Sequence, residues 1–151
     1  MWDSVIEVLM IVQGDSRNPS KAGGYVQIME SFSFVLVMKM MLQVLCITNE
    51  LSLVLQRKDQ NIVQAMSLIV DVKARLMGLR NNGWEPLFEE VKTFCEEKEI
   101  LIPNMEEMIP RWGRTRREKG TLITQDHYYR VDTFLCAIDA IITEMDHRLM
   151  R

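Results

Sequence analysis

A short basic segment has the residue types that bind phosphate groups. It runs from Arg111 to Lys119 with the sequence RWGRTRREK, and its five cations stand against one anion, Glu118, for a local charge of +4. An arginine guanidinium makes two parallel hydrogen bonds to a phosphate, and an indole ring can stack on a base or a sugar. The segment therefore predicts contact with a nucleic-acid backbone. The residues that would make this contact are Arg111, Trp112, Arg114, Arg116, Arg117 and Lys119.

Two other interpretations of this segment stay open. Basic residues are common in solvated loops, and long-range attraction would hold such a loop near the acidic stretch that precedes it. That stretch, residues 85–107, carries eight carboxylates against Lys92 and Lys98, for a local charge of −6. A run of arginines and lysines is also typical of a nuclear-import signal. Binding residues often lie in long irregular loops, which favours a functional role without deciding between these interpretations.

The carboxylates do not have the spacing of a catalytic site. A two-metal hydrolase needs acidic side chains that converge on one point. Neighbouring residues on a helix point about 100° apart, so adjacent acidic pairs are typical of a solvated helix face. The adjacent pairs here are Glu89-Glu90, Glu96-Glu97 and Glu106-Glu107.

Cysteine and histidine residues indicate neither a metal site nor a nucleophile. Cys46, Cys95 and Cys136 are far apart, odd in number and without a CxxC pair, which favours free thiols in a reducing compartment. His127 and His147 do not have ligand spacing with these cysteines. We expect no enzymatic activity, no metal and no cofactor.

Length and composition predict one globular domain. The chain has 151 residues, 48% of them hydrophobic, and a net charge of −3, so a polyanion would have to be bound locally. The apolar stretch 25–47 is the candidate membrane span, but Glu30 and Lys39 leave charge-free runs shorter than the roughly 20 residues that a span requires. We expect an intracellular, nuclear protein with no membrane partner and no small-molecule substrate.

Hydrophobic periodicity predicts an all-α fold, an irregular bundle of five or six helices with a long basic loop before the last helix. The longest regular apolar stripe runs along residues 60–81, with Asp59 as its N-cap and Asn81-Asn82-Gly83 ending it in a left-handed conformation. Thr124 is the expected cap of the last helix. Strand is the competing interpretation at residues 34–37. The expected helices span 2–13, 25–47, 49–58, 60–81, 85–98 and 124–149, and residues 99–123 are expected to be irregular.

Several blocks of the sequence recur in order in a known family. They are MWDSVIEVL, MESFSFVLVMKMML, CITNELSLVLQRKDQNIVQAMSLI, the GW turn, the run from Phe94-Cys95 to Pro103-Asn104-Met105, the Arg-rich loop and HYYRVDTFLCAID. In these blocks the chain resembles the hAT-superfamily transposase-derived proteins of plants, which are often labelled zinc-finger MYM-type-like. The resemblance covers essentially the whole chain, and the ITNELS…LQRKDQNIV…AM block is its most specific part.

The resemblance implies a fragment of a larger protein. Complete members have a zinc finger, an RNase-H-like domain with three acidic metal ligands, a helical insertion between the second and third ligand, and a dimerisation region. This chain corresponds to the helical insertion and its flanks, so no catalytic residue of the family carries over.

We therefore expect a non-catalytic transposase remnant with weak, sequence-independent nucleic-acid contact through the Arg-rich loop. The alternative is a helical protein-interaction module that associates with itself or with related transposase-like chains, because the apolar helix at 25–47 would need a cover.

Overall fold

The computed structural model describes residues 1–14, 19–56, 62–110 and 122–149. Within these ranges the chain is mostly helical, and the all-α prediction is confirmed. The helices are α1 (Trp2–Gly14), α2 (Pro19–Met29), α3 (Phe32–Leu55), α4 (Ile62–Asn82), α5 (Trp84–Glu97), α6 (Gln125–His127), the π-helix η1 (Tyr128–Leu135) and α7 (Cys136–Leu149). The last three follow one another without a break and form one C-terminal rod.

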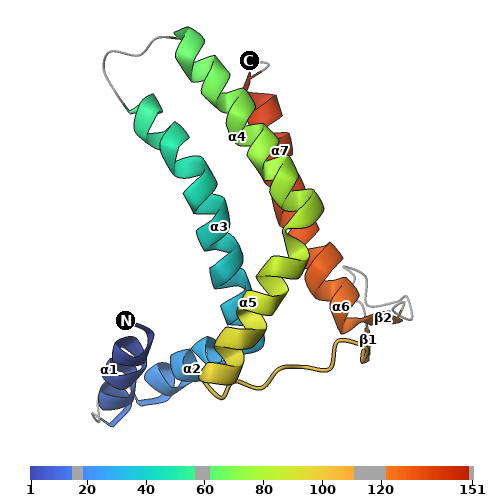
Figure 1. Cartoon of the computed structure of the whole chain (residues 1–151). Coiled ribbons are helices and arrows are strands. Elements are labelled where there is room, and N and C mark those ends of the chain that lie inside the picture. The colour runs from blue at the N-terminus through green and yellow to red at the C-terminus, as the bar shows by residue number, and fades with distance from the viewer. Residues whose placement is uncertain (15–18, 57–61, 111–121, 150–151) are drawn as a thin grey trace, which may run out of the picture.

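Two long arms and a foot make up the molecule (Figure 1). Helices α3 and α4 run antiparallel as the arms, and the C-terminal rod lies beside α4. Helix α5 continues from the lower end of α4 and crosses the base of α3. Helices α1 and α2 pack on each other at the foot, beside the start of α3.

The main core lies where α3, α5 and the C-terminal rod meet, and we call it the junction core. Its rings pack edge to face or tilted, with centroid distances of 5.1 Å for Phe32–Tyr129 and 5.6 Å for Trp84–Phe134. A smaller cluster of Val44, Val72 and Leu76 joins the two arms. The buried members of the junction core are Phe32, Val35, Leu36, Met40, Trp84, Leu87, Val91, Cys95, Ile100, Tyr129, Phe134 and Ile138.

The prediction of one helix over residues 25–47 was wrong about where the helix begins and about its continuity. A helix already begins at Pro19, where proline fits the first turn because it has no N–H to satisfy. The chain then breaks after Met29, because Ser31 is extended and its hydroxyl accepts a hydrogen bond from the Phe34 N–H at 3.3 Å. This is a normal N-cap, so α3 starts afresh at Phe32.

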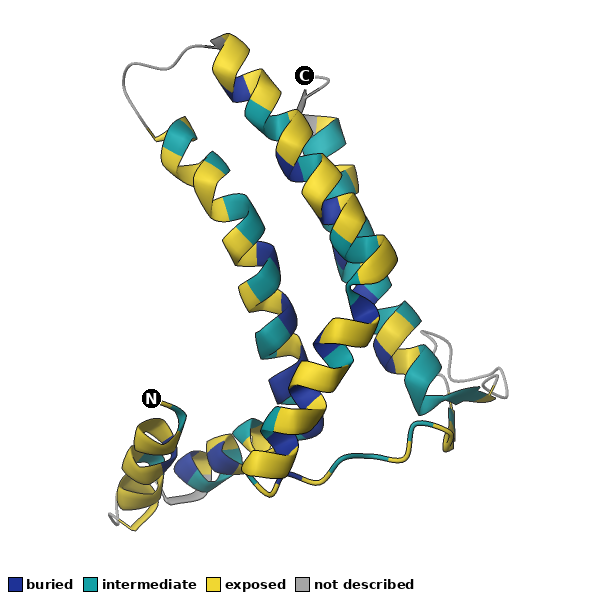
Figure 2. Ribbon diagram, viewed as in Figure 1, coloured by how far each residue is buried: buried dark blue, intermediate teal, exposed yellow. Residues whose placement is uncertain are grey.

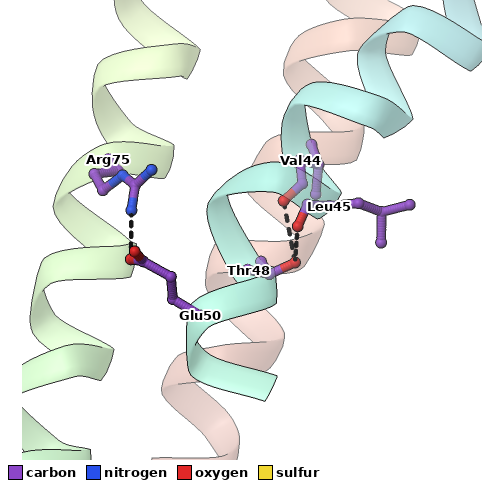
Figure 3. Close-up of polar contacts among 5 residues, drawn as sticks. All are labelled: Val44, Leu45, Thr48, Glu50 and Arg75. Atoms are coloured by element: carbon purple, nitrogen blue, oxygen red, sulfur yellow. Dashed lines mark hydrogen bonds and ion pairs between the residues drawn. The ribbon is translucent and has the colours of Figure 1, made fainter. Parts of the chain in front are cut away.

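The predicted boundary between helices 25–47 and 49–58 was also wrong, because α3 continues through it to Leu55. The Thr48 hydroxyl donates to the backbone carbonyl of Val44 at 3.0 Å, so this polar group is satisfied inside the helix (Figure 3). Glu50 leaves the helix sideways and accepts a hydrogen bond from Arg75 on α4 at 3.1 Å (Figure 3). Glu50 thus links α3 to α4, whereas Thr48 bonds within α3. Neither residue interrupts the helix.

Gly83 does not take the left-handed conformation that the sequence predicts. Its φ of −86° and ψ of −15° are close to helical, and its N–H donates to the Leu79 carbonyl at 2.7 Å. The chain therefore turns from α4 into α5 almost without leaving helical geometry. Glycine is required by close approach, because a Cβ at this position would lie 2.4 Å from the Leu79 oxygen. Asp59, the predicted cap of α4, lies outside the described residues.

Residues 99–123 are not irregular throughout. Strand β1 (Met108–Pro110) pairs antiparallel with β2 (Leu122–Thr124), with Met108 opposite Thr124 and Pro110 opposite Leu122. Thr124 also caps the C-terminal rod as predicted, since its hydroxyl accepts from the His127 N–H at 3.1 Å. A single pairing of three residues is too short to show the alternation by which strands are recognised in a sequence.

Replacing Gly83 by alanine tests the close approach at the α4–α5 turn. Gly83→Ala should lower the free energy of unfolding by about 1–3 kcal/mol, because the new methyl group overlaps the Leu79 carbonyl. Gly78→Ala is the matched control, since a Cβ there meets nothing within 4 Å, and it should raise stability by about 0.5–1 kcal/mol. Urea unfolding followed by circular dichroism measures both. Equal effects of the two substitutions would contradict the assignment.

Candidate protein-interaction surface

The site residues predicted from the sequence lie outside the described residues. This applies to Arg111, Trp112, Arg114, Arg116, Arg117 and Lys119. The structure does place the two ends of their segment, because Pro110 and Leu122 are paired in the β-ladder. The basic residues thus lie, in the sequence, between two strands that contact each other.

Side chains capable of metal binding or nucleophilic chemistry are scattered in the part of the chain that is described. No group of three or more His, Cys, Asp or Glu residues within that part could hold a metal ion. Cys46 and Cys136 are exposed, whereas Cys95 is buried in the junction core. Burial raises the pKa of the Cys95 thiol, which keeps it protonated and unreactive at neutral pH.

Ion pairs link the helices to one another. Lys39 on α3 contacts Glu90 on α5 at 2.7 Å, and Lys98 at the end of α5 contacts Asp3 on α1 at 2.7 Å. Helix α4 makes ion pairs with two helices. Arg75 pairs with α3, and Lys73 and Arg80 pair with α7. Each of these pairs joins two helical segments and is compatible with the way in which they face one another.

The Arg80–Asp139 pair has the geometry of a two-pronged clamp between α4 and α7. Arg80 Nε and Nη2 donate to the two carboxylate oxygens, with 2.9 Å between Nη2 and Oδ2. The hydrogen bond from Arg80 holds the pKa of Asp139 below its usual value, and Asp139 in turn raises the pKa of Arg80. Lys98 lowers the pKa of Asp3 in the same way, first through its hydrogen bond.

Helix α3 is apolar on both its inner and its outer side. The row Leu36–Met40–Val44 is buried in the two cores. Two further rows at four-residue spacing, 34–38–42 and 37–41–45, lie on the outer side and consist of Phe, Val, Met and Leu. Residues Val37, Met41, Leu42 and Leu45 are each between 41% and 55% exposed. Exposed residues recur along the whole length of this arm (Figure 2).

Within the described residues, α3 is the one helix that is long and apolar enough to cross a bilayer by length and composition. Only 28% of its apolar window is buried. Two of its charged residues are engaged with protein partners, Lys39 with Glu90 and Glu50 with Arg75. Within the part of the chain that the structure describes, Val37, Met41, Leu42 and Leu45 of this helix remain exposed.

Helix α1 adds a second apolar row next to the base of α3. Trp2 anchors it, with its ring 5.2 Å from Phe94 and 5.9 Å from Phe34. The positions 1, 5, 8 and 12 follow helical spacing, and Met1, Val5, Val8 and Val12 are all exposed. A groove of about 300 Å³ lies between the two helices, lined by Met1, Trp2, Val5, Met29, Phe34, Met38, Lys39, Leu42 and Phe94.

We call these two rows together the α1/α3 surface. It contains no ionisable side chain in its rows, and Lys39 at its edge is neutralised by Glu90 and lies 5.2 Å from the centre of the Phe94 ring. The members are Met1, the α1 residues Val5, Val8 and Val12, and the α3 residues Phe34, Val37, Met38, Met41, Leu42 and Leu45, of which Phe34 and Met38 are half-buried.

Sequence reasoning detected this feature only in part. The absence of a polar side between Tyr25 and Ile47 indicated that a helix there would need a cover. It did not show which rows remain open, because that depends on where α4 and α5 pack. The role of α1 was missed, although the spacing of Met1, Val5, Val8 and Val12 was visible as a signal.

Comparison with protein-family models, curated proteins and solved structures gives no match for this chain. The resemblance to hAT transposase-derived proteins therefore remains a prediction.

Removing the Asp139 carboxylate tests the α4–α7 clamp. Because the pKa of Asp139 is lowered in the folded state, its pairing stabilises the fold above the unfolded pKa and is lost as the pH falls through the lowered value. Asp139→Asn should therefore be less stable than the wild type at pH 7, and the difference should shrink below about pH 4.

Urea unfolding at several pH values measures this difference. Glu89→Gln is the control, since Glu89 has no ion-pair partner among the described residues and should leave the stability at pH 7 nearly unchanged. A difference between Asp139→Asn and wild type that stays constant with pH would contradict the clamp.

Proposed function

We propose that this chain is a helical protein-interaction module and that the α1/α3 surface binds a helix of another polypeptide. The observation that carries the proposal is the exposure of the row 37–41–45 and of Leu42 on the outer side of α3, next to the groove at α1. The largest contiguous apolar patch of a soluble protein is often functional, and a patch rimmed by polar residues marks an interaction site.

The shape of the surface favours a helical partner. Rows at four-residue spacing form ridges, and ridges of one helix pack into the grooves of another. Anchor side chains at i, i+3, i+4 and i+7 are the usual pattern of helix-in-groove recognition. Phe34, Val37, Met38 and Met41 have this spacing on α3. Methionine adapts its shape to different partners, which suits a binding face.

The resemblance to hAT transposase-derived proteins supports a specific version of this proposal. In that version the chain is the non-catalytic helical insertion of such a protein, and a transposase-like domain is what covers the α1/α3 surface. Neither catalysis nor a metal is part of the proposed role.

A synthetic amphipathic peptide tests the interaction module directly. The probe is a fluorescently labelled helix with leucine at positions 1, 5, 8 and 12 and with glutamate and lysine elsewhere, titrated with the full chain. The wild type should bind in the micromolar range. Met41→Glu and Leu45→Glu should weaken binding at least tenfold, because each would bury an unpaired charge.

Val70→Glu is the matched control, since Val70 is 66% exposed and lies on α4, away from the α1/α3 rows. It should bind the peptide as the wild type does, and circular dichroism should show that each variant is folded. No binding by the wild type at concentrations where sedimentation shows a monomer, or equal binding by all variants, would contradict the proposal.

We propose nucleic-acid contact through Arg111–Lys119 as a second function. Five cations and Trp112 are concentrated in nine residues, and the flanking strands β1 and β2 are paired. If all five cations meet phosphates on a duplex, the logarithm of the binding constant should fall with the logarithm of salt concentration with a slope of about −4 to −5.

The triple variant Arg114→Ala, Arg116→Ala, Arg117→Ala should reduce that slope to about −2, because two cations remain. Fluorescence anisotropy with a labelled 20-base-pair duplex over a potassium chloride series measures it. The matched control removes three exposed cations elsewhere, Lys21, Lys92 and Arg130, and should keep the wild-type slope. Unchanged binding by the first variant would exclude this function.

A further inference from the structure

We propose that the occupant of the α1/α3 surface is a second copy of this chain, bound through antiparallel packing of the two α3 helices about a two-fold axis near Met41. The inference rests on the proposed function, because it names the partner of the same surface.

The absence of charge on the surface allows a copy to bind it. A two-fold interface brings each residue of the patch against the same patch of the partner, so a charged patch would repel itself. The α1/α3 rows contain no ionisable side chain, and Lys39 at the edge is held by Glu90 at 2.7 Å. Self-pairing therefore buries no like charges against one another and leaves no charge unpaired.

The extent of the surface matches one ordinary interface. The exposed residues Met1, Val5, Val37, Met41, Leu42 and Leu45 lie around the groove and along the outer row of α3, and together they present an apolar area of several hundred Å², against roughly 800 Å² per partner in a standard protein–protein interface. A second copy would thus cover the patch in one contact. Nothing larger than the chain itself is needed.

The row 37–41–45 determines the position of the two-fold axis. Met41 lies at the centre of this row, so in antiparallel packing it contacts Met41 of the partner, and Leu45 contacts Val37 of the partner. Helix α1 lies beside the first turns of α3. In an antiparallel pair, the C-terminal half of the partner's α3 therefore runs towards α1. Exposed Leu53 lies on that half and supplies an apolar side chain there.

A lipid bilayer fits the same surface less well. A helix that crosses a bilayer alone is surrounded by lipid on all sides, but the inner row of α3 is packed against protein in two cores. Lys39 and Glu50, eleven residues apart, lie on nearly the same side and pair with α5 and α4. Insertion of α3 would have to break both pairs and both cores.

Sedimentation equilibrium of the full chain tests the self-pairing. The wild type should reach twice the chain mass of 17.7 kDa at micromolar concentration. Met41→Glu should raise the dissociation constant at least tenfold, whereas Val70→Glu on α4 should leave it unchanged. A dimer that Val70→Glu disrupts and Met41→Glu does not would overturn the assignment of the surface.

Cysteine cross-linking tests the two-fold axis with a milder change. In a background with Cys46→Ser and Cys136→Ser, Met41→Cys places two thiols together across the axis. Diamide takes up the two electrons and two protons, and a covalent dimer should form in high yield. Val70→Cys in the same background should form no covalent dimer, because its thiol lies on α4 and away from the axis. Buried Cys95 is present in both variants, so it does not affect the comparison between them.

The results also separate this inference from the proposed function. A monomeric chain that still binds the synthetic helix would overturn self-pairing and leave the interaction module intact. A chain that neither dimerises nor binds the helix would overturn both. Flotation of the chain with phosphatidylcholine vesicles, lost in Met41→Glu, would overturn self-pairing in favour of a lipid surface.

Discussion

The structure depends on a constraint at α3, a helix of 24 residues that is apolar around most of its circumference. A helix in a small bundle can bury one face against its neighbours, and here that face is the row that enters the junction core and the cluster between the arms. The outer rows are equally apolar, and the groove at their start is bordered by residues of α1, α2 and α5.

Ion pairs between charged residues connect neighbouring helices. Exposed ion pairs contribute little to stability, and all five described here are at least partly exposed. Their effect is geometric, because α4 contacts α3 through Arg75 and α7 through Lys73 and Arg80. The packed side chains of the two cores set which side of α3 faces inwards, and the ion pairs are compatible with that orientation.

Structural features that follow from hydrophobic periodicity were predicted from the sequence. Features that depend on a single polar group, or on a partner far away in the sequence, were not. The helix pattern and the Thr124 cap follow from local spacing and were found. The break at Ser31 and the continuity through Thr48 were missed, because serine and threonine hydroxyls can either cap a helix or bond inside it. Gly83 looked like a left-handed terminator, but its role is close approach to Leu79. The pairing of β1 with β2 depends on a contact across residues 111–121, which no local pattern specifies.

The two proposed binding regions are compatible and would reinforce each other. The strands β1 and β2 that flank the basic segment lie across α5 from α1, so a partner on the α1/α3 surface does not cover them (Figure 1). A two-fold pair would then carry two basic segments in one particle. Binding of the second segment to the same duplex becomes intramolecular, which raises affinity without any new contact, provided that the spacing allows both to engage. Apolar pairing through α3 would in this way set the strength of an electrostatic contact that is weak in a single chain.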